Sequence, residues 1–502
     1  MAFAGRDLTD IHCFTADELR YVLAKSQEIK AALKMRDPAG YRLADQRDLL
    51  AALLFYENST RTRTSFEIAA MRLGMRTTGF ASMEGTSVSK GESLRHTLDM
   101  YEAYQCDCVI MRHPLDGSAR FAAEHLHIPV FNAGDGKHEH PTQTILDLFT
   151  IQEHIGRLHD LDVGVSGDLK YGRTAHSLVV ALTKFPGNRI HLFSHPDLAL
   201  PKELIRLAQE SGAQVIEHDS MEDIVAATDI LYQTRIQKER MPDLSEFDKA
   251  KARSQFTLKM MQLTRPHFGL MHPLPIDKTA PSITTEVDAH PKALYKRQAG
   301  NGVPTRLTEL ALSLNLLGSD FAGERWQETS EDDIYFEERE IRNSPVRENL
   351  SILPIRTNGV VIDHMAPYTE DLLLTILKVR QRRDIYRAAT VKSRSRPDSI
   401  KGMLMIENRT LTDDDLRAIA SVSPGCTVNT IENAQVIRKQ RLQLPNRIQN
   451  VPGMMCTNKG CISRPEHLEA VMPKMLRTAS HSVRCHYCDE VMDISQIVNT
   501  SR

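Results

Sequence analysis

Apolar and polar residues alternate along the first part of the chain in blocks that predict helices and strands. Apolar positions recur at helical spacing over residues 17–33, after a capping Thr15 or Asp17. Residues 49–56, "LLAALLFY", then predict a buried strand, and residues 65–74 predict a helix that ends at a glycine. A strand, a hydroxyl-rich turn and a helix in this order bring free backbone N–H groups to one point. That geometry favours a bound phosphate.

The alternation of strands and helices continues to about residue 318 and predicts two parallel-sheet α/β domains. A second strand, turn and helix unit spans residues 161–185. In parallel sheets of this kind, ligands gather at the carboxyl ends of the strands. Further strands are predicted at 106–112, 128–134, 189–194, 213–218, 229–235 and 267–275, and helices at 91–104 and 141–156.

The pattern changes after Gly318. Residues 324–343 are densely charged and contain the only tryptophan, Trp326, and we interpret them as a solvated linker, in part helical, rather than a binding segment. Beyond the linker the pattern is typical of a small mixed sheet with helices. Strands are predicted at 359–365, 404–411 and 427–437, and helices at 368–379 and 413–422.

Composition and charge narrow the class of protein. The 502 residues are 41% hydrophobic and 25% charged, which is typical of globular protein, and their number suggests about three or four domains. A formal net charge of -2 gives no general attraction to nucleic acid or to an anionic membrane, so we expect neither as a partner. No apolar run has the length of a membrane span, and the N-terminus lacks the apolar core of a signal peptide. We expect a cytoplasmic protein.

Several cations stand at predicted strand ends or in loops. Residues 59–65, "STRTRTS", place two arginines among five hydroxyls directly after a predicted strand. Arg112 ends another strand, and Lys90 lies with Ser87 in a glycine-flanked loop. Each alone is more often a surface charge, but the planar guanidinium fork suits phosphate oxygens, so together they indicate an anion site.

His140 lies in "KHEHPTQT", where Pro141 is suited to the first position of a helix and Gln143 follows on its first turn. A neutral imidazole at this helix terminus could donate a hydrogen bond to a carbonyl oxygen, since the terminus disfavours its protonation. A capping histidine without a catalytic role is the alternative. With 20 histidines in the chain, the motif alone favours that alternative.

The turn of the second domain also carries cations. Residues 167–174, "GDLKYGRT", fit the P-loop spacing except that Arg173 replaces the lysine, so nucleotide hydrolysis is only a minor alternative. Arg235 ends another strand, with Gln237 on the same side if the extended conformation persists. Arg173 and Arg235 could clamp a dicarboxylate, one arginine for each carboxylate. Residues 271–275, "MHPLP", form a loop that can present backbone carbonyls to an amide.

These motifs occur in one order over residues 5–318 and closely resemble the catalytic chain of the aspartate carbamoyltransferase family: "STRTRTSFE", "MRHP", "NAGDGKHEHPTQT", "GDLKYGRTAHSL", "TRIQKER", "HPLP" and "QAGNG". The resemblance implies transfer of the carbamoyl group of carbamoyl phosphate to the amine of L-aspartate, in pyrimidine biosynthesis. Ornithine carbamoyltransferase shares the first and the His-Pro-x-Gln motifs, but it typically has a cysteine in its equivalent of "HPLP" and lacks "TRxQ". Ornithine as acceptor, or a binding protein with a vestigial catalytic half, remain the alternatives.

The resemblance also implies roles for single residues. Ser87 and Lys90 would reach the site of a neighbouring subunit, so the family implies a homo-oligomer built on trimers, and no cofactor would be needed for catalysis. Glu57 would bridge the two domains through Arg173 and Arg240. Ile276 stands after "HPLP" where the family often has arginine, which leaves the closure contacts of that loop open. Carbamoyl phosphate would bind Ser59, Thr60, Arg61, Thr62, Ser87, Lys90, Arg112, His140 and Gln143, with Arg61, Thr62, Arg112 and His140 catalytic, and aspartate would bind Lys90, Arg173, Arg235, Gln237 and the carbonyl of Leu274.

Cysteines cluster near the C-terminus at spacings typical of a metal site. Cys456 and Cys461 precede Cys485 and Cys488, a set of four thiolates suited to tetrahedral Zn²⁺. With all four ligands from protein, the metal would be structural. A nucleic-acid-binding zinc ribbon is the rival interpretation, but Tyr487 is the only aromatic residue of the cluster apart from histidines.

Residues from about 346 to the end resemble the regulatory chain of the same family, on "GVVIDHM", "MIENRTL", "TVNTIENAQVI" and "LPNRIQNV". The resemblance implies a nucleotide site and control by ATP, CTP or UTP, although Met405 and Leu353 stand where the family usually has a lysine and an acid. The nucleotide residues would be Asp363, His364, Lys401, Asn429 and Lys439. The expected domains are a carbamoyl-phosphate domain (1–150), an aspartate domain (151–318), a charged linker (319–345), an α+β regulatory-like domain (346–445) and a four-cysteine zinc domain (446–502).

Overall fold

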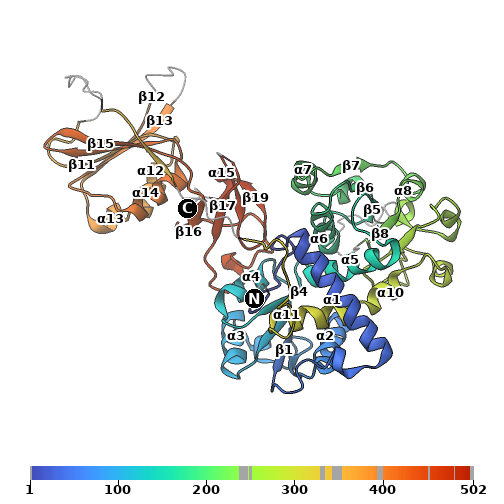
Figure 1. Cartoon of the computed structure of the whole chain (residues 1–502). Helices are drawn as coiled ribbons and strands as arrows, with labels where there is room; N and C mark the ends of the chain where they lie inside the picture. The colour runs from blue at the N-terminus through green and yellow to red at the C-terminus, as the bar shows by residue number, and fades with distance from the viewer. Residues whose placement is uncertain are drawn as a thin grey trace. The chain divides into compact units, whose positions relative to one another are not determined.

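The structure is a computed structural model that describes residues 3–236, 247, 251–327, 334–341, 353–392, 400–449, 451, 453–479 and 481–497. The chain divides into two compact units, Met1–Glu328 and Thr329–Arg502, which are described separately (Figure 1). The first unit therefore continues into residues that the sequence pattern assigned to the linker.

The first unit begins with a parallel four-stranded sheet in the order β2-β1-β3-β4. Its central strand β1 (Leu50–Phe55) is buried along almost its whole length, as expected for an apolar strand covered on both faces. The other strands are β2 (Arg76–Phe80), β3 (Cys108–His113) and β4 (Val130–Asp135), and the helices are α1 (Ala16–Met35), α2 (Thr60–Leu73), α3 (Leu94–Ala103), α4 (Ser118–His125) and α5 (Pro141–Ile155).

Helix ends follow the capping residues of the sequence. Thr15 caps α1 in a reciprocal capping box with Glu18, while Asp17 lies inside the helix. Helix α2 ends at Gly74, which has a φ of 103° that favours glycine, but it begins at Thr60. The hydroxyl-rich turn predicted before residue 65 is therefore largely the first turn of the helix.

The second sheet of this unit is parallel, in the order β7-β6-β5-β8-β9. Both parallel-sheet domains confirm the predicted fold class of this part of the chain. The strands are β5 (Asp162–Gly167), β6 (Arg189–Ser194), β7 (Gln214–Glu217), β8 (Ile230–Gln233) and β9 (Gly269–Met271), and the helices include α6 (Arg173–Leu182), α7 (Lys202–Glu210), α8 (Met221–Ala227), α10 (Tyr295–Gly300) and α11 (Gly302–Ser313).

Each sheet has a topological switch point, where consecutive strands lie on opposite sides of a central strand. In the first sheet the switch lies between β1 and β3, and in the second it lies between β5 and β8. Ligands of open parallel sheets bind at such points, beyond the carboxyl ends of the strands. The segments that follow these four strands carry the polar motifs of the sequence.

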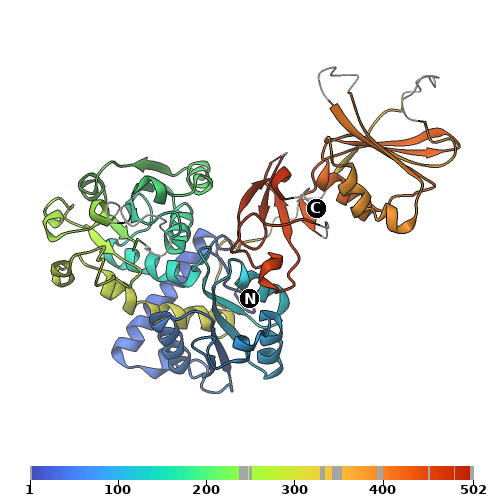
Figure 2. The same cartoon turned by 180° about the vertical axis from the view of Figure 1, so that it is seen from behind.

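Helices α5 and α11 join the two sheets. Helix α5 runs from β4 to β5 and is buried from Pro141 to Ile151 except at Gln143, because other elements cover nearly all of its faces. Helix α11 packs on α2, α1 and α5, and the blue α1 and the olive α11 lie side by side in both views (Figures 1 and 2). Side chains on α5 and α11 can therefore reach groups of both sheets.

The second unit contains a six-stranded antiparallel sheet in the order β10-β15-β14-β11-β13-β12, so the predicted mixed sheet is wrong in its strand directions. Strand β10 (Phe336–Glu338) was assigned to the linker, and it forms the edge of the sheet beside β15. Residues 427–437 form two strands that turn at Asn433 and Ala434, both with positive φ. The other elements are β11 (Gly359–Met365), β12 (Tyr386–Lys392), β13 (Ile400–Glu407), β14 (Thr427–Glu432), β15 (Gln435–Leu442), α12 (Glu370–Ile376), α13 (Val379–Arg382) and α14 (Asp413–Val422).

The cysteine-containing part of the second unit forms a smaller antiparallel sheet in the order β16-β17-β18-β19. Its elements are β16 (Arg447–Gln449), β17 (Lys474–Arg477), β18 (Ser482–Cys485), β19 (Val491–Asp493) and the short helix α15 (Ile494–Ile497). Among the helices that the structure describes, none has the combination of length and apolar character that crossing a membrane requires.

Candidate active site

A cavity of about 600 Å³ lies in the first unit, where the segments beyond β1, β3, β5 and β8 meet. Five arginines line it, and Glu57 is the one carboxylate among its described lining residues. A cavity with this balance of charge is suited to a small polyanion. The arginines are Arg61, Arg112, Arg173, Arg235 and Arg306.

The end of the cavity near β1 is built by the N-terminus of α2. Ser59 is the N-cap residue, and its hydroxyl makes no capping hydrogen bond. Thr60, Arg61 and Thr62 follow on the first turn and line the cavity. Free N–H groups, hydroxyls and the helix dipole converge here, which suits a phosphate. Arg63 is paired within the helix, because its Nη1 lies 3.0 Å from Glu67 Oε2, one helical turn further along. It is therefore not expected to bind the phosphate.

Arg112 and Glu57 form the centre of the cavity wall. Arg112 Nε lies 3.3 Å from Glu57 Oε2, and its Nη1 donates to Ser59 Oγ at 3.4 Å. Burial and the charge of Arg173 lower the pKa of Arg112 to about 9, so the guanidinium is charged at neutral pH. A largely covered cation that shares the Glu57 carboxylate with another arginine is available to stabilise negative charge on a ligand.

His140 is the buried N-cap residue of α5, and Pro141 occupies the first helical position, as the sequence predicts. Burial lowers the pKa of His140 well below its usual value, and the charges of Arg173, Arg112 and Arg306 add to this effect. The imidazole is therefore neutral at pH 7. Its Nδ1 lies 3.3 Å from Thr142 Oγ1, and if that hydroxyl donates to Nδ1, the proton stands on Nε2.

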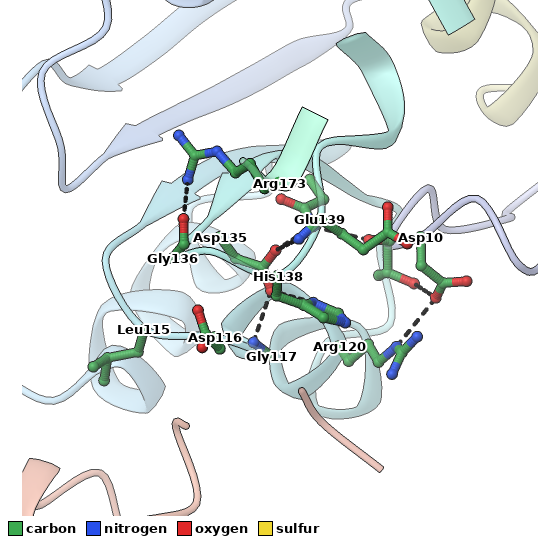
Figure 3. Close-up of polar contacts among 12 residues, drawn as sticks. Asp10, Leu115, Asp116, Gly117, Arg120, Asp135, Gly136, His138, Glu139 and Arg173 are labelled. Carbon is green, nitrogen blue, oxygen red and sulfur yellow. Dashed lines mark hydrogen bonds and ion pairs between the residues drawn. The ribbon is translucent and has the colours of Figure 1, made fainter. Parts of the chain in front are cut away.

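The loop that carries His140 is held by a buried carboxylate, Asp135 (Figure 3). The Asp135 oxygens accept hydrogen bonds from the backbone N–H of Gly117 at 2.7 Å and of Glu139 at 3.1 Å, and His138 Nδ1 lies 3.1 Å away. Although burial raises the pKa of Asp135, the His138 ring, the Asn132 amide and the Gly117 N–H outweigh burial and lower it. A charged carboxylate with several donors is a rigid support for the loop.

Arg173 begins α6 and reaches from the second sheet to the first. Its Nη1 donates to the backbone oxygen of Gly136 at 2.6 Å (Figure 3) and lies 3.8 Å from Glu57 Oε2. Glu57 thus stands between Arg112 and Arg173. Of the two arginines expected to pair with Glu57 across the domains, Arg240 lies outside the described residues.

Arg235 and the loop after β9 close the opposite wall. Arg235 follows β8 and lines the cavity together with Leu274, whose backbone N–H donates to His272 Nδ1 at 2.7 Å. Burial, Arg61 and Arg235 lower the pKa of His272 to about 3, so this histidine is a neutral support of the loop. Gln237, expected to contact aspartate, lies outside the described residues.

The remaining expected ligands of the first unit divide into two groups. Gln143 lines the cavity from the first turn of α5. Ser87 and Lys90 are exposed in the short helix Ser87–Lys90 and are not among the described residues that line this cavity. Within one copy of the chain, the structure does not bring them to the other expected ligands.

Sequence reasoning missed Arg306 and Gln298. Arg306 is buried in α11, donates to Ser65 Oγ, and has its guanidinium carbon 4.9 Å from the centre of the Phe66 ring. Burial lowers its pKa to about 10. The one cation of a helix whose residues are nearly all buried was the available signal, because such a charge is rarely buried without a role. Gln298 lies in "QAGNG", a motif on which the family resemblance rests, and the sequence predicted no role for it.

The expected nucleotide residues of the second unit lie on neighbouring strands β13, β11, β14 and β15. Lys401 Nζ lies 2.6 Å and 2.8 Å from the two oxygens of Asp363, and His364 Nδ1 lies 3.3 Å from Asp363 Oδ2. Asn429 and Lys439 are paired across β14 and β15. Met405 is buried in β13, whereas Leu353 is exposed.

The four expected metal ligands Cys456, Cys461, Cys485 and Cys488 are buried, and their sulfur atoms all lie within 4.8 Å of one another. The Sγ atoms are 3.5 Å apart between Cys456 and Cys488 and 3.7 Å apart between Cys461 and Cys485. Zinc–sulfur bonds of about 2.3 Å in a tetrahedron require sulfur atoms about 3.8 Å apart. The residues fit a structural metal with four thiolate ligands.

Comparison with known proteins finds four family matches along the chain. They are the carbamoyl-phosphate-binding domain of aspartate/ornithine carbamoyltransferase (residues 6–153), the Asp/Orn binding domain of the same enzymes (159–312), the allosteric domain of the aspartate carbamoyltransferase regulatory chain (350–443) and the metal-binding domain of that chain (446–498).

Individual relatives agree with these matches. The aspartate carbamoyltransferase catalytic subunit of Thermococcus kodakarensis is 43% identical over 319 residues, 63% of this chain and 100% of that protein. That of Methanosarcina barkeri is 41% identical over 317 residues, again 63% and 100%. Among solved structures, the catalytic subunit of M. jannaschii aspartate transcarbamoylase has a TM-score of 0.57 at 38% identity, covering 61% of this chain and 97% of that one. The Trypanosoma cruzi enzyme in complex with carbamoyl phosphate and aspartate has a TM-score of 0.57 at 29% identity, covering 62% and 98%.

Proposed function

The chain belongs to the aspartate carbamoyltransferase family, as a catalytic chain fused to a regulatory-type chain, and from this premise we propose how its cavity performs the reaction. The chain transfers the carbamoyl group of carbamoyl phosphate to the amine of L-aspartate, giving N-carbamoyl-L-aspartate and phosphate, a reaction of pyrimidine biosynthesis. The observation that supports this function best is the convergence of five arginines on one cavity at two topological switch points.

The phosphate of carbamoyl phosphate binds at the N-terminus of α2. Ser59, Thr60 and Thr62 offer hydroxyls and backbone N–H groups, and Arg61 adds a guanidinium from the same turn. Burial lowers the pKa of Arg61, but the guanidinium keeps its charge at neutral pH and can pair with the phosphate.

Arg112, Thr62 and His140 polarise the carbamoyl carbonyl. As the amine of aspartate attacks the carbonyl carbon, a C–N bond forms and negative charge develops on the carbonyl oxygen. Arg112 stabilises that charge, and the neutral imidazole of His140 donates a hydrogen bond to it. The carbon–oxygen bond to phosphate then breaks, its electron pair leaves with the phosphate, and the proton that the attacking amine loses goes to the departing phosphate oxygen. Holding both reactants in one cavity supplies a further part of the rate enhancement.

Arg173 and Arg235 hold the two carboxylates of aspartate from the far side of the cavity, with the carbonyl of Leu274 nearby. The two cations stand after different strands, so each can bind one carboxylate of a dicarboxylate. Their positive charges disfavour an acceptor with a cationic side chain. Gln237 is proposed as a further contact on the strength of its motif alone.

Ser87 and Lys90 complete the site of a neighbouring copy, in an assembly built on trimers. Their exposure, together with their place outside the cavity of their own chain, supports this proposal. Sedimentation analysis at assay concentration should find a multiple of three chains. Mixing Lys90→Ala chains with Arg61→Ala chains should restore activity, because some sites then receive both intact residues. A monomeric active enzyme would contradict the trimer.

The second unit binds zinc and nucleotides. Zinc suits the four buried thiolates and would hold the small sheet together as a structural ion, with no open position for substrate. The cluster of Asp363, His364 and Lys401 on adjacent strands supports nucleotide binding. Aspartate saturation curves that superimpose with and without ATP, CTP and UTP, with no heat of binding, would refute nucleotide control.

Formation of carbamoyl aspartate from carbamoyl phosphate and aspartate tests the catalytic function. Arg61→Ala should lower kcat by about 100-fold or more, the usual effect of removing a donor that stabilises transition-state charge. Arg63→Ala is the matched control, since Arg63 lies two residues away and pairs with Glu67 instead. Equal rates with ornithine and aspartate would refute the two-arginine clamp, and unchanged activity of Arg61→Ala would refute the phosphate site.

A further inference from the structure

Asp147 is a fully buried carboxylate on α5, one helical turn beyond Gln143. Its Oδ1 atom accepts a hydrogen bond from Gln143 Nε2 at 2.9 Å and another from Gln298 Nε2 at 2.6 Å. Both glutamines line the cavity, whereas Asp147 itself does not. The carboxylate therefore lies behind two side chains that face the substrates.

The direction of these hydrogen bonds follows from a backbone group. The N–H of His272 donates to Gln298 Oε1 at 2.9 Å, and a backbone N–H can only donate. The amide nitrogen of Gln298 must then face Asp147, so Asp147 Oδ1 must accept. Burial raises the pKa of Asp147 to about 7. The ionised carboxylate can only accept, so in that form the group of Gln143 that faces the same oxygen is its NH₂ group. The orientation of both amides, usually ambiguous, is thus determined by the network.

The carbonyl oxygen of Gln143 is the atom left for the substrate. No group in the described part of the chain donates to Gln143 Oε1. An oxygen in that position can accept a hydrogen bond from an amide NH₂ group, but it gains nothing from a methyl group of the same size. An acceptor that faces the bound ligand favours an analogue with the donor over one without it, because in the second complex the acceptor has no partner on the ligand.

We propose that Asp147 is a positioning residue that makes the site selective for acyl phosphates bearing an amide NH₂ group over those bearing a methyl group. It acts through Gln143, whose carbonyl oxygen it directs at the carbamoyl nitrogen. Asp147 is also linked to the loop after β9, because Gln298 donates to Asp147 and accepts from the backbone N–H of His272 in that loop. The proposal rests on the proposed function, and it adds a residue outside the cavity that sets the choice of substrate.

Two inert phosphonates of the same shape test the proposal. Phosphonoacetamide carries an NH₂ group where acetonylphosphonate carries a methyl group, and titration calorimetry with the full-length chain gives the ratio of their dissociation constants. The wild-type chain should bind the amide at least about tenfold more tightly, the usual effect of one buried hydrogen bond. Asp147→Leu should bring the ratio to within about threefold of unity, because Gln143 is then free to rotate.

Five further variants separate positioning from loss of structure. Asp147→Asn retains an acceptor at Oδ1 and should keep the wild-type ratio. Thr150→Val is the matched control, since it removes another buried hydrogen-bonding group of α5, the Oγ1 that accepts from Asn301. Gln143→Leu and the double variant Gln143→Leu/Asp147→Leu should show the same ratio, because Asp147 has no effect without Gln143. Asp147→Ala, which has no acceptor, replaces the Leu variant if that variant does not fold.

A folded Asp147→Leu or Asp147→Ala chain that keeps the wild-type ratio would overturn the proposal. Additive effects of the Gln143 and Asp147 substitutions on this ratio would also overturn the proposal, because Asp147 would then act independently of Gln143. Formation of carbamoyl aspartate by the wild-type chain is measured first. Its absence refutes the proposed function, whereas its presence with an unchanged ratio refutes only the role of Asp147.

Discussion

Gly134→Ala should weaken aspartate binding although Gly134 is not among the described residues that line the cavity. Gly134 lies in β4 with a φ of 112°, and a Cβ atom added there would stand 2.9 Å from Cζ and 3.1 Å from Nη2 of Arg173. Non-bonded carbon atoms do not approach so closely, so the guanidinium must shift. It would lose its place beside the oxygen of Gly136, which it now reaches at 2.6 Å.

The size of the effect follows from the bonds that Arg173 would make to a carboxylate. A hydrogen bond to a charged group contributes about 1.5–3 kcal/mol, so misplacing one such bond should raise KM for aspartate about 10- to 100-fold. Binding of phosphonoacetamide should change less than about twofold, because the phosphate site lies on α2. The positive φ adds a stability cost of about 1–2 kcal/mol for any residue with a Cβ.

Gly156→Ala separates this backbone cost from the displacement of Arg173. Gly156 has a φ of 89° at the C-terminus of α5, and nothing lies within 4 Å of its added Cβ. Steady-state rates at varied aspartate, calorimetry and thermal melting are compared for both variants and the wild type. If Gly134→Ala keeps the wild-type KM, or if Gly156→Ala raises KM equally, then Arg173 does not hold aspartate from its observed position.

Three other predictions follow from buried charges and from the thiolates. Arg112→Gln should lower kcat about 10²- to 10³-fold in the carbamoyl aspartate assay, as the loss of an oxyanion-stabilising donor does, and a change below about threefold would exclude Arg112 from the transition state. Neither carboxylate oxygen of buried Glu309 has a hydrogen-bond partner in the described part of the chain, and burial raises its pKa from 4.5 to about 8. The folded chain keeps a proton that the unfolded chain releases, so stability falls as pH rises from 4.5 to about 8. Thermal melts should therefore show Glu309→Leu gaining about 3 kcal/mol on the wild type between pH 5 and pH 7, and parallel pH profiles would contradict this. Metal analysis should find about one zinc per chain, lost in Cys461→Ser but kept in Cys426→Ser, whose cysteine is buried outside the cluster; equal metal content would refute the site.

The local elements of the fold could be predicted because their signals are local. Residues 413–422 form α14 as expected, since Thr412 caps an amphipathic stretch with three acidic residues in its first turn. The hairpin in residues 427–437 was missed because its turn is made by Asn433 and Ala434. Alanine is rarely found with positive φ, so the sequence contains no strong turn signal there. Strand β10 was missed because three residues of a charged segment pair with β15 only in the folded sheet.

Part of the candidate site could also be predicted from the sequence. The structure brings Arg61, Arg112, His140 and Gln143 to one cavity with Arg173, Arg235 and Leu274. Each of these residues lies at a helix N-terminus, at a strand end or in the loop that follows a strand, where short motifs have a direct geometric meaning. The role of each residue in binding and catalysis stays a prediction until the assays above are done.

The sequence by itself determined the family, the order of sheets and helices, the four thiolates and the cations at the strand ends, because these depend on residue type and short spacing. Only the tertiary structure decided which distant residues act behind them. Arg306 donates a hydrogen bond to Ser65, which is 241 residues away in the sequence, and Gln298 donates one to Asp147, which is 151 residues away. Such contacts depend on how α5 and α11 pack between the two sheets, and no local pattern encodes a distance between residues so far apart in the chain. The direction in which Gln143 points depends on a backbone N–H at residue 272, and only the packed structure contains that relation.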